Sequence, residues 1–243
     1  ADLALRFDLT VPLARFYAAN RAKLPPIFRC QHIGPVWRAD RPQKGRFREF
    51  MQCDVDAVGS ASPAMEAEVI LATSEVFRSL LGESFTVHMN DRRLLTAFLD
   101  EAGIPADRHP GALIAIDKLD KIQEAGVRTE LAGRGVPEAK TDALLTRLKV
   151  AQGWGWDAPE LPETLKTVGA LTKGLAPLRF DPFLVRGQDY YTGPIFEVRM
   201  EGFPGAMAGG GRYDGLIGRF LGKPVPAVGF SIGFERLLLV LEE

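Results

Sequence analysis

The chain has 243 residues, of which 46% are hydrophobic and 25% are charged, as in ordinary globular proteins. Its 30 basic and 31 acidic residues give a net charge of −1, so the composition does not indicate a nucleic-acid binder, although it leaves room for a local basic patch. No apolar run reaches the ~18 to 20 residues that cross a bilayer, and no cleavable signal opens the chain. We expect a cytoplasmic protein without membrane contacts.

Cysteine and histidine are too few and too scattered to suggest a metal site or a disulfide framework. Cys30 and Cys53 form no CxxC pair. The three histidines, His32, His88 and His109, are far apart in the sequence. We therefore expect a reducing compartment and no tightly bound metal.

Residues 27–59 predict a long antiparallel hairpin. Two strand-like runs, 27–40 and 47–59, flank the polar turn RPQKGR. Near and within the second run one parity is apolar and the other polar, so we expect the apolar face to lie against a core and the polar face to carry function. The polar parity is Arg46, Arg48, Phe50, Gln52, Asp54 and Asp56, and the apolar parity is Phe47, Met51, Cys53, Val55 and Ala57.

Helices and strands continue along the chain. Residues 64–81 predict a helix between Pro63 and Gly82, 84–90 a strand, and 91–103 a helix with Asn90 as its cap and Gly103 at its end. The expected apolar face of the first helix is Met65, Val69, Ala72, Val76 and Leu80.

The sequence pattern changes at about residue 105, where strand-like alternation stops. Charged helical segments follow one another to residue 177, and strands return at 178–200 and 228–233 before an apolar helix. The pattern predicts an α+β fold, an antiparallel sheet flanked by helices. We expect a core of residues 1–104 and 178–243 with a helical insertion at 105–177.

Arginines in turns and strand ends suggest an anion site. Singly, each is typical of a solvated surface group, but together their guanidinium groups suit phosphate oxygens. Phe50, on the polar strand face, either covers a sheet edge or stacks on a nucleobase. The arginines are Arg38, Arg46, Arg186 and Arg236.

A second group of polar residues could hold an ammonium or an imidazole N–H. It comprises Asp8, Gln52, Asp56, Asp189, Tyr190 and Tyr191. Spacing alone favours Asp54 and Asp56 as a solvated strand face. The segment GGGRYDG (209–215) matches no P-loop or dinucleotide turn, and is either a tight turn or a place where a ligand lies close to the sheet.

Several segments resemble those of class II aminoacyl-tRNA synthetases. WRADRPQKGRFREF (37–50) is similar to motif 2, and VGFSIGFERLLL (228–239) is similar to motif 3. LVRGQDYYTG (184–193), AGGGRYDGL (208–216) and RFDLT (6–10) resemble segments specific to the histidyl-tRNA synthetase family. Five such segments in the correct order are a specific signal.

The resemblance implies activation of L-histidine with ATP, supplied as its Mg²⁺ complex, and transfer to histidine tRNA. Arg38 would hold the α-phosphate and the substrate carboxylate, Arg46 and Arg236 the β- and γ-phosphates, and Phe50 the adenine. Arg186 would be the catalytic cation opposite Arg38. By the same resemblance, Asp40 belongs to the ATP site, and the histidine pocket would consist of Asp8, Thr10, Gln52, Asp56, Tyr190, Tyr191 and Tyr213.

The chain departs from the family pattern in places. Motif 1, which builds the class II dimer, would precede Ala1, and the anticodon-binding domain would follow Glu243, so we interpret the chain as a trimmed core of a homodimeric protein. Asp40 stands where Glu is usual, and Gln188 where an apolar residue is common.

Two other functions share the expected fold. One is the non-catalytic, synthetase-like regulatory subunit of ATP phosphoribosyltransferase, and the other is a pseudo-synthetase domain that binds uncharged tRNA. The joint presence of Arg38, Arg46, Arg186 and Arg236 favours a working ATP site over both.

Overall fold

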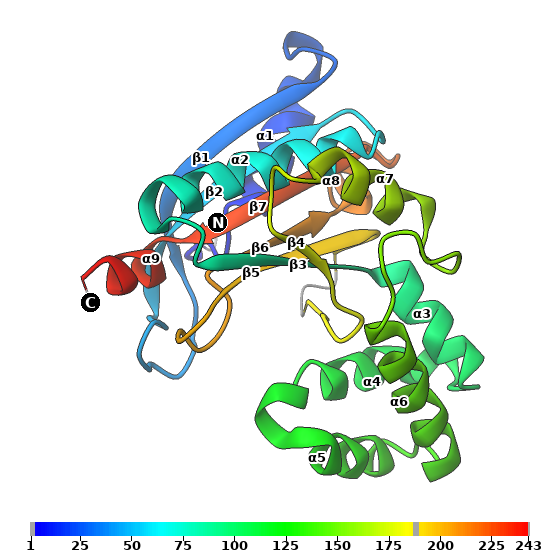
Figure 1. The fold of residues 1–243 in the computed structure, drawn as a ribbon. Helices are drawn as coiled ribbons and strands as arrows, with labels where there is room; N and C mark the ends of the chain where they lie inside the picture. Colours follow the sequence, from blue (N-terminus) through cyan, green and yellow to red (C-terminus); the bar gives the residue numbers. More distant parts are fainter. Residues whose placement is uncertain (1–2, 187–189, 243) are drawn as a thin grey trace.

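A computed structural model describes residues 3–186 and 190–242 (Figure 1). Its described strands form one seven-stranded sheet in the order β1-β2-β7-β6-β5-β3-β4, in which the β3–β4 pair is parallel and the other pairs are antiparallel. The expected α+β fold is confirmed. The strands are β1 (Phe28–Trp37), β2 (Glu49–Val58), β3 (Phe85–Asp91), β4 (Leu178–Phe180), β5 (Pro194–Met200), β6 (Ala208–Arg212) and β7 (Ala227–Gly233).

Helices cover the sheet and extend beyond it. α2 crosses one sheet face, in contact with β2, β7 and β3, and α7 packs on α2. The α-helices are α1 (Thr10–Asn20), α2 (Ala64–Leu81), α3 (Arg92–Glu101), α4 (His109–Ile116), α5 (Leu119–Gly133), α6 (Glu138–Gln152), α7 (Glu163–Thr172), α8 (Asp214–Leu221) and α9 (Phe234–Leu241). Short 3₁₀ turns, η1 (Arg21–Lys23) and η2 (Ala106–Arg108), complete the described helical elements.

The predicted hairpin is present, but its polar face is the more deeply buried one. β1 and β2 pair from Phe28 opposite Val58 to Trp37 opposite Glu49. Asp54 and Asp56 are buried, whereas Cys53 and Val55 on the apolar parity are only partly buried, against the core beneath α2. The expectation of a solvated acidic face was therefore wrong. β2 begins at Glu49, so Arg46 and Arg48 belong to the preceding loop.

α2 has the predicted bounds but a different buried face. Met65 and Val69 are buried as expected, whereas Ala72, Val76 and Leu80 are exposed. The helix instead buries Ile70 and Phe77 together with Glu66, Thr73 and Ser74. Glu66 is buried because its carboxylate accepts two hydrogen bonds from Arg212 on β6, of which the Nη2–Oε2 bond measures 2.7 Å. This ion pair ties α2 to the sheet.

The cap of α3 is Asp91 rather than Asn90. The Asp91 carboxylate accepts a hydrogen bond from the Arg93 backbone N–H at 2.8 Å. Asn90 is buried, and its side-chain amide donates to the carbonyls of Pro182 and Leu184 at 3.1 and 3.0 Å. Asn90 thus holds the segment that leads to Arg186.

The region from 105 to 177 contains only helices among its described elements. η2, α4, α5 and α6 extend away from the sheet together with α3 (Figure 1), while α7 lies over α2. The division into a core and an insertion stays a prediction.

Candidate active site

The sheet face opposite α2 forms the floor of a cavity of about 940 Å³. Cross-strand register sets a row of opposed residues on this face, because directly paired residues of neighbouring strands point the same way. The row crosses all the strands of the sheet: His32, Asp54, Ser231, Gly209, Glu197, His88 and Arg179. This sheet face therefore carries polar residues from one edge to the other, and all of the row except His32 lines the cavity.

Glycines on the central strands make room for protein side chains. A Cβ at Gly209 would overlap the Arg186 guanidinium, and one at Gly229 would overlap the Asp56 carboxylate. The segment 209–215 was predicted to be either a tight turn or a place where a ligand lies close to the sheet. In the structure Gly209 on β6, like Gly229 on β7, leaves room for a charged side chain of the protein.

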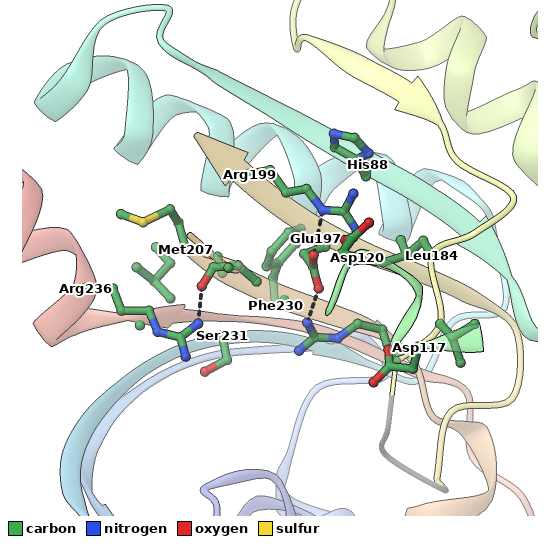
Figure 2. A pocket seen from close by; sticks show the side chains of 18 of the residues that line it. His88, Asp117, Asp120, Leu184, Glu197, Arg199, Met207, Phe230, Ser231 and Arg236 are labelled. Atoms are coloured by element: carbon green, nitrogen blue, oxygen red, sulfur yellow. Dashed lines mark hydrogen bonds and ion pairs between the residues drawn. The ribbon is translucent and has the colours of Figure 1, made fainter. Parts of the chain in front are cut away.

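A chain of ion pairs fixes Arg186. Its Nη1 donates to Glu197 Oε2 at 2.6 Å, and Arg199 Nε donates to Glu197 Oε1 at 2.8 Å. Arg199 also pairs with Asp181 at 3.2 Å, and His88 Nδ1 lies 2.9 Å from the same Asp181 oxygen. Glu197, Arg199 and His88 face the cavity in Figure 2. The Arg186 charge lowers the pKa of Glu197, although burial opposes this effect.

One donor of Arg186 is left without a partner among the described residues. Its Nε is buried and has no hydrogen-bond partner among the described residues. Asp117, at the end of α4, is close enough for its charge to raise the pKa of Arg186, though less than Glu197 does. The guanidinium is thus held by Glu197 on one side, and its buried Nε is unpaired within the described part of the chain.

Arg38 lies between two aromatic rings. Its guanidinium carbon is 4.4 Å from the centre of the Phe7 ring and 4.9 Å from that of the Phe50 ring. Its Nε donates to the Phe7 carbonyl at 3.2 Å. Burial lowers the pKa of Arg38, which still leaves it a cation at neutral pH because arginine loses its proton only far above this range.

The loop between β1 and β2 brings Arg46 to the cavity and contacts Arg236 of α9. Arg46 Nε lies 3.4 Å from the Asp40 carboxylate, in a tight turn closed by backbone bonds between Gln43 and Arg46. Arg236 Nε, at the start of α9, donates to the Gly45 carbonyl at 2.9 Å, and its Nη1 donates to Ala206 (Figure 2). Burial and the nearby Arg46 and Arg186 charges lower the pKa of Arg236. Such repelling cations favour an anionic ligand.

Carboxylates gather at the other end of the floor. Asp56 accepts a hydrogen bond from the Tyr213 hydroxyl at 2.5 Å, and burial raises its pKa to about 8. Burial likewise raises the pKa of Asp54 to about 7. Asp8 caps the start of α1 by accepting from the Val11 N–H at 3.0 Å. These buried acids favour a cationic or N–H-rich ligand because such a ligand stabilises their charged forms.

Tyrosines and an amide complete this end. The Tyr190 ring centre lies 4.9 Å from that of Tyr191 and 6.2 Å from that of Tyr213. Burial raises the pKa of all three phenols, which therefore stay neutral donors. Gln52 Nε2 donates to Ser231 Oγ at 2.9 Å. Thr10, the first residue of α1, also lines the cavity.

The structure brings almost all the predicted site residues to one cavity. Asp8 does not line the cavity, but its charge is close enough to act on the pKa of Arg38 and of Asp54, raising both. Gln188 and Asp189 lie outside the described residues. The lining members are Thr10, Arg38, Asp40, Arg46, Phe50, Gln52, Asp56, Arg186, Tyr190, Tyr191, Tyr213 and Arg236.

Sequence reasoning missed several lining residues. Glu197 alternates with apolar neighbours on β5 and could have been singled out, whereas Asp181 and Ser231 carry no local signal. Asp117 and Asp120 come from the expected insertion, which was given no role at the site (Figure 2).

The mostly antiparallel sheet with its helices has the fold of class II aminoacyl-tRNA synthetases, and its cavity has cations at one end and carboxylates at the other. A sequence model of the histidyl-tRNA synthetase family matches residues 1–237. The chain belongs to this family.

Individual proteins similar to this chain carry names from the same family. The chain is 49% identical to a histidine–tRNA ligase of Leifsonia xyli subsp. xyli, over 99% of this chain and 60% of the relative. It is 44% identical to one of Aeropyrum pernix, over 97% of this chain and 57% of the relative. The solved histidyl-tRNA synthetase of Nostoc sp. PCC 7120 superposes with a TM-score of 0.81 at 31% identity, covering 98% of this chain and 60% of that one. The chain thus spans about three fifths of the length of these proteins.

Another solved structure shares the fold alone. A Bacillus halodurans protein described as an ATP phosphoribosyltransferase regulatory subunit/histidyl-tRNA synthetase has a TM-score of 0.76 at 23% identity. It covers 98% of this chain and 64% of that one. Among the described residues of the present chain, we find no helix with the length and apolar character needed to cross a bilayer.

Proposed function

We propose that this chain is the catalytic core of an enzyme that joins L-histidine to ATP, giving histidyl-adenylate and pyrophosphate, and then transfers histidine to its tRNA. The observation that carries the proposal is the cavity itself, whose cationic end suits a triphosphate and whose acidic end suits an amino acid with an N–H-rich side chain. ATP would arrive as its Mg²⁺ complex. In the full-length protein we expect a cytoplasmic homodimer.

The cationic end would bind ATP. Phe50 stacks on adenine. Adenine would use the face of the Phe50 ring that Arg38 does not cover, or Arg38 would move off the ring when ATP binds. Arg46 and Arg236 bind the β- and γ-phosphates, and Asp40 orients Arg46 through their ion pair. Their mutual repulsion in the empty site is relieved when phosphate binds.

The reaction places its charge between two arginines. The histidine carboxylate attacks the α-phosphorus, the bond to the pyrophosphate oxygen breaks, and negative charge builds on the non-bridging oxygens. Arg38 holds the α-phosphate and the attacking carboxylate, and Arg186 faces the same phosphate with its unpartnered Nε. Preformed cations in a buried site offset this charge without reorganisation.

The acidic end would select histidine. Asp8, Thr10 and Gln52 hold the amino group, and Asp56 accepts the imidazole N–H while Tyr213 supports its other contact. Tyr190 and Tyr191 enclose the ring. An apolar analogue would leave Asp56 buried without its ligand, which disfavours binding.

Histidine-dependent ATP–pyrophosphate exchange by the full-length protein tests this function. Arg186→Ala should reduce exchange by on the order of 10²-fold or more, by comparison with loss of an oxyanion donor. Arg15→Ala, which removes an exposed arginine of α1, serves as the matched control and should leave the rate unchanged. Wild-type protein that binds histidine but shows no exchange would instead support the regulatory function, and near-normal exchange by Arg186→Ala would contradict its catalytic role.

A further inference from the structure

Two buried acceptors among the residues that line the cavity have no hydrogen-bond partner in the described part of the chain. Gln52 Oε1 and Asp54 Oδ1 make no hydrogen bond to any described residue, although the side chains are only 8% and 3% exposed and both line the cavity. Buried oxygens without donors are rare in folded proteins because each costs desolvation energy that nothing offsets. Their presence on one floor indicates a ligand that carries several N–H donors.

The donors near these oxygens are already engaged. Gln52 directs its own N–H₂ at Ser231 Oγ at 2.9 Å, so Gln52 Oε1 faces away from Ser231. Ser231 lies directly opposite Asp54 on β7, and its hydroxyl hydrogen bond lowers the pKa of Asp54 against the effect of burial. One carboxylate oxygen of Asp54 thus accepts a hydrogen bond from Ser231, and Oδ1 has no donor among the described residues.

The neighbouring carboxylates are more fully used. Asp56 receives the Tyr213 hydroxyl at 2.5 Å, and Asp8 receives the Val11 backbone N–H at the start of α1. Asp54 is therefore the acid in this cluster with a buried oxygen that no described residue pairs.

We propose that Asp54, together with the Gln52 carbonyl oxygen, binds the α-ammonium group of the amino-acid substrate and requires that this group be charged. The proposal rests on the proposed function and adds a specificity residue to it. An ammonium group offers three N–H donors, enough for Asp54 Oδ1, Gln52 Oε1 and one acceptor from Asp8 or Thr10, the other residues placed at the amino group above.

Neighbouring charges agree with this placement. Arg38, the expected partner of the substrate carboxylate, is close enough for its charge to lower the pKa of Asp54. A bound amino acid would therefore set its carboxylate toward Arg38 and its ammonium toward Asp54. Along β2, alternate residues would then contact adenine (Phe50), ammonium (Gln52 and Asp54) and imidazole (Asp56), since alternate residues of a strand share one face.

A pair of ligands separates this role from others. L-Histidine and imidazolelactate share the carboxylate and the imidazole, but the latter carries a neutral hydroxyl in place of the ammonium. We would measure the affinity of the full-length protein for each by calorimetry. Asp54→Asn should weaken histidine binding roughly 10- to 100-fold, the value of one charge-assisted hydrogen bond, and change imidazolelactate binding little. Glu49→Gln removes an exposed carboxylate from the same strand and should affect neither ligand.

Each other outcome has a distinct meaning. Equal weakening of both ligands by Asp54→Asn would overturn the proposal, because Asp54 would then serve the imidazole or the fold. Unchanged histidine affinity would overturn it as well. Wild-type protein that binds neither ligand would overturn the proposed function and this inference together, whereas histidine binding with an indifferent Asp54→Asn variant rejects the inference alone.

A measurement on the wild-type protein covers the case in which the variant does not fold. Lowering the pH from about 8 to about 6 protonates Asp54, whose pKa in the empty site is about 7, and should reduce the preference for histidine over imidazolelactate. The ratio is first corrected for the different imidazole pKa values of the two free ligands, and a corrected preference that stays constant would overturn the proposal. Other titratable or charged groups near Asp54 face both ligands alike and largely cancel in the ratio: Asp8, His32, Arg38, Asp56, Cys30, Cys53, Tyr191 and Tyr213.

Discussion

Replacing Glu197 with alanine should slow histidine activation far more than it weakens the binding of either substrate. Glu197 holds Arg186 by a 2.6 Å hydrogen bond and Arg199 by one of 2.8 Å. Without the carboxylate, two guanidinium groups remain side by side, with Asp181 left to pair with Arg199. Arg186 would then move away from its position over Gly209, from which the proposed function has it face the α-phosphate.

The expected magnitude follows from these contacts. The Glu197 side chain is 13% exposed, so its bonds to the two arginines are partly shielded from water, and a charge-assisted bond of this kind contributes about 1.5–3 kcal/mol. Loss of that much positioning energy in the transition state corresponds to a roughly 10- to 100-fold decrease in kcat. The loss should not exceed that of Arg186→Ala, because Glu197 acts only through the arginine.

The assay is ATP–pyrophosphate exchange with histidine and ATP varied separately. Glu197→Gln keeps an acceptor for Arg186 without the charge, and should recover part of the lost kcat at unchanged KM values. Thermal unfolding of each variant checks the fold. Wild-type kcat in Glu197→Ala, or a loss that Glu197→Gln does not relieve and that follows the change in Tm, would refute the reasoning.

Other substitutions test the two ends of the cavity. Phe50→Ala should raise the KM for ATP much more than that for histidine, since base stacking contributes about 1–3 kcal/mol; an equal rise for both would mean that Phe50 supports the hairpin instead. Asp56 has a pKa raised to about 8 in the folded chain, above the ordinary ~3.9 of the unfolded chain, so its contribution to stability is lost as pH rises through this interval. Asp56→Asn should therefore raise the urea midpoint at about pH 8 and lose this advantage toward pH 4, and a pH-independent difference would contradict the assigned burial effect.

Local patterns predicted the elements better than the faces they bury. Period two identified the hairpin, and Pro63 and Gly82 marked the ends of α2, because strand alternation and helix termini depend on neighbouring residues. The buried face of α2 could not be predicted in this way. Val76 and Leu80 are exposed and Glu66 is buried, since the partner of Glu66 is Arg212, 146 residues further along the chain.

At the site, too, residues in local motifs could be predicted, whereas residues whose role depends on distant partners could not. Arg38, Phe50 and Arg186 could be selected because they lie in recognisable segments, and the structure brings them to one cavity. Glu197 and Asp54 could not be given roles, because their meaning depends on strand pairing: Glu197 lies opposite Gly209, and Asp54 opposite Ser231. Alternation along a strand can single out a polar residue, but the pairings that give it a role are set by the whole sheet.

The glycines beneath Arg186 and Asp56 have a consequence for how this site can be dissected. Truncation to alanine reveals what a side chain contributes, but at Gly209 and Gly229 the contribution is the space where a side chain would be. A scan that only removes atoms passes over both positions. Replacing either glycine with alanine would keep the charged side chain, Arg186 or Asp56, but would displace it. Truncating the charged residue itself removes the charge. Comparing the two kinds of variant would show whether the site needs the charge alone or the charge at this position.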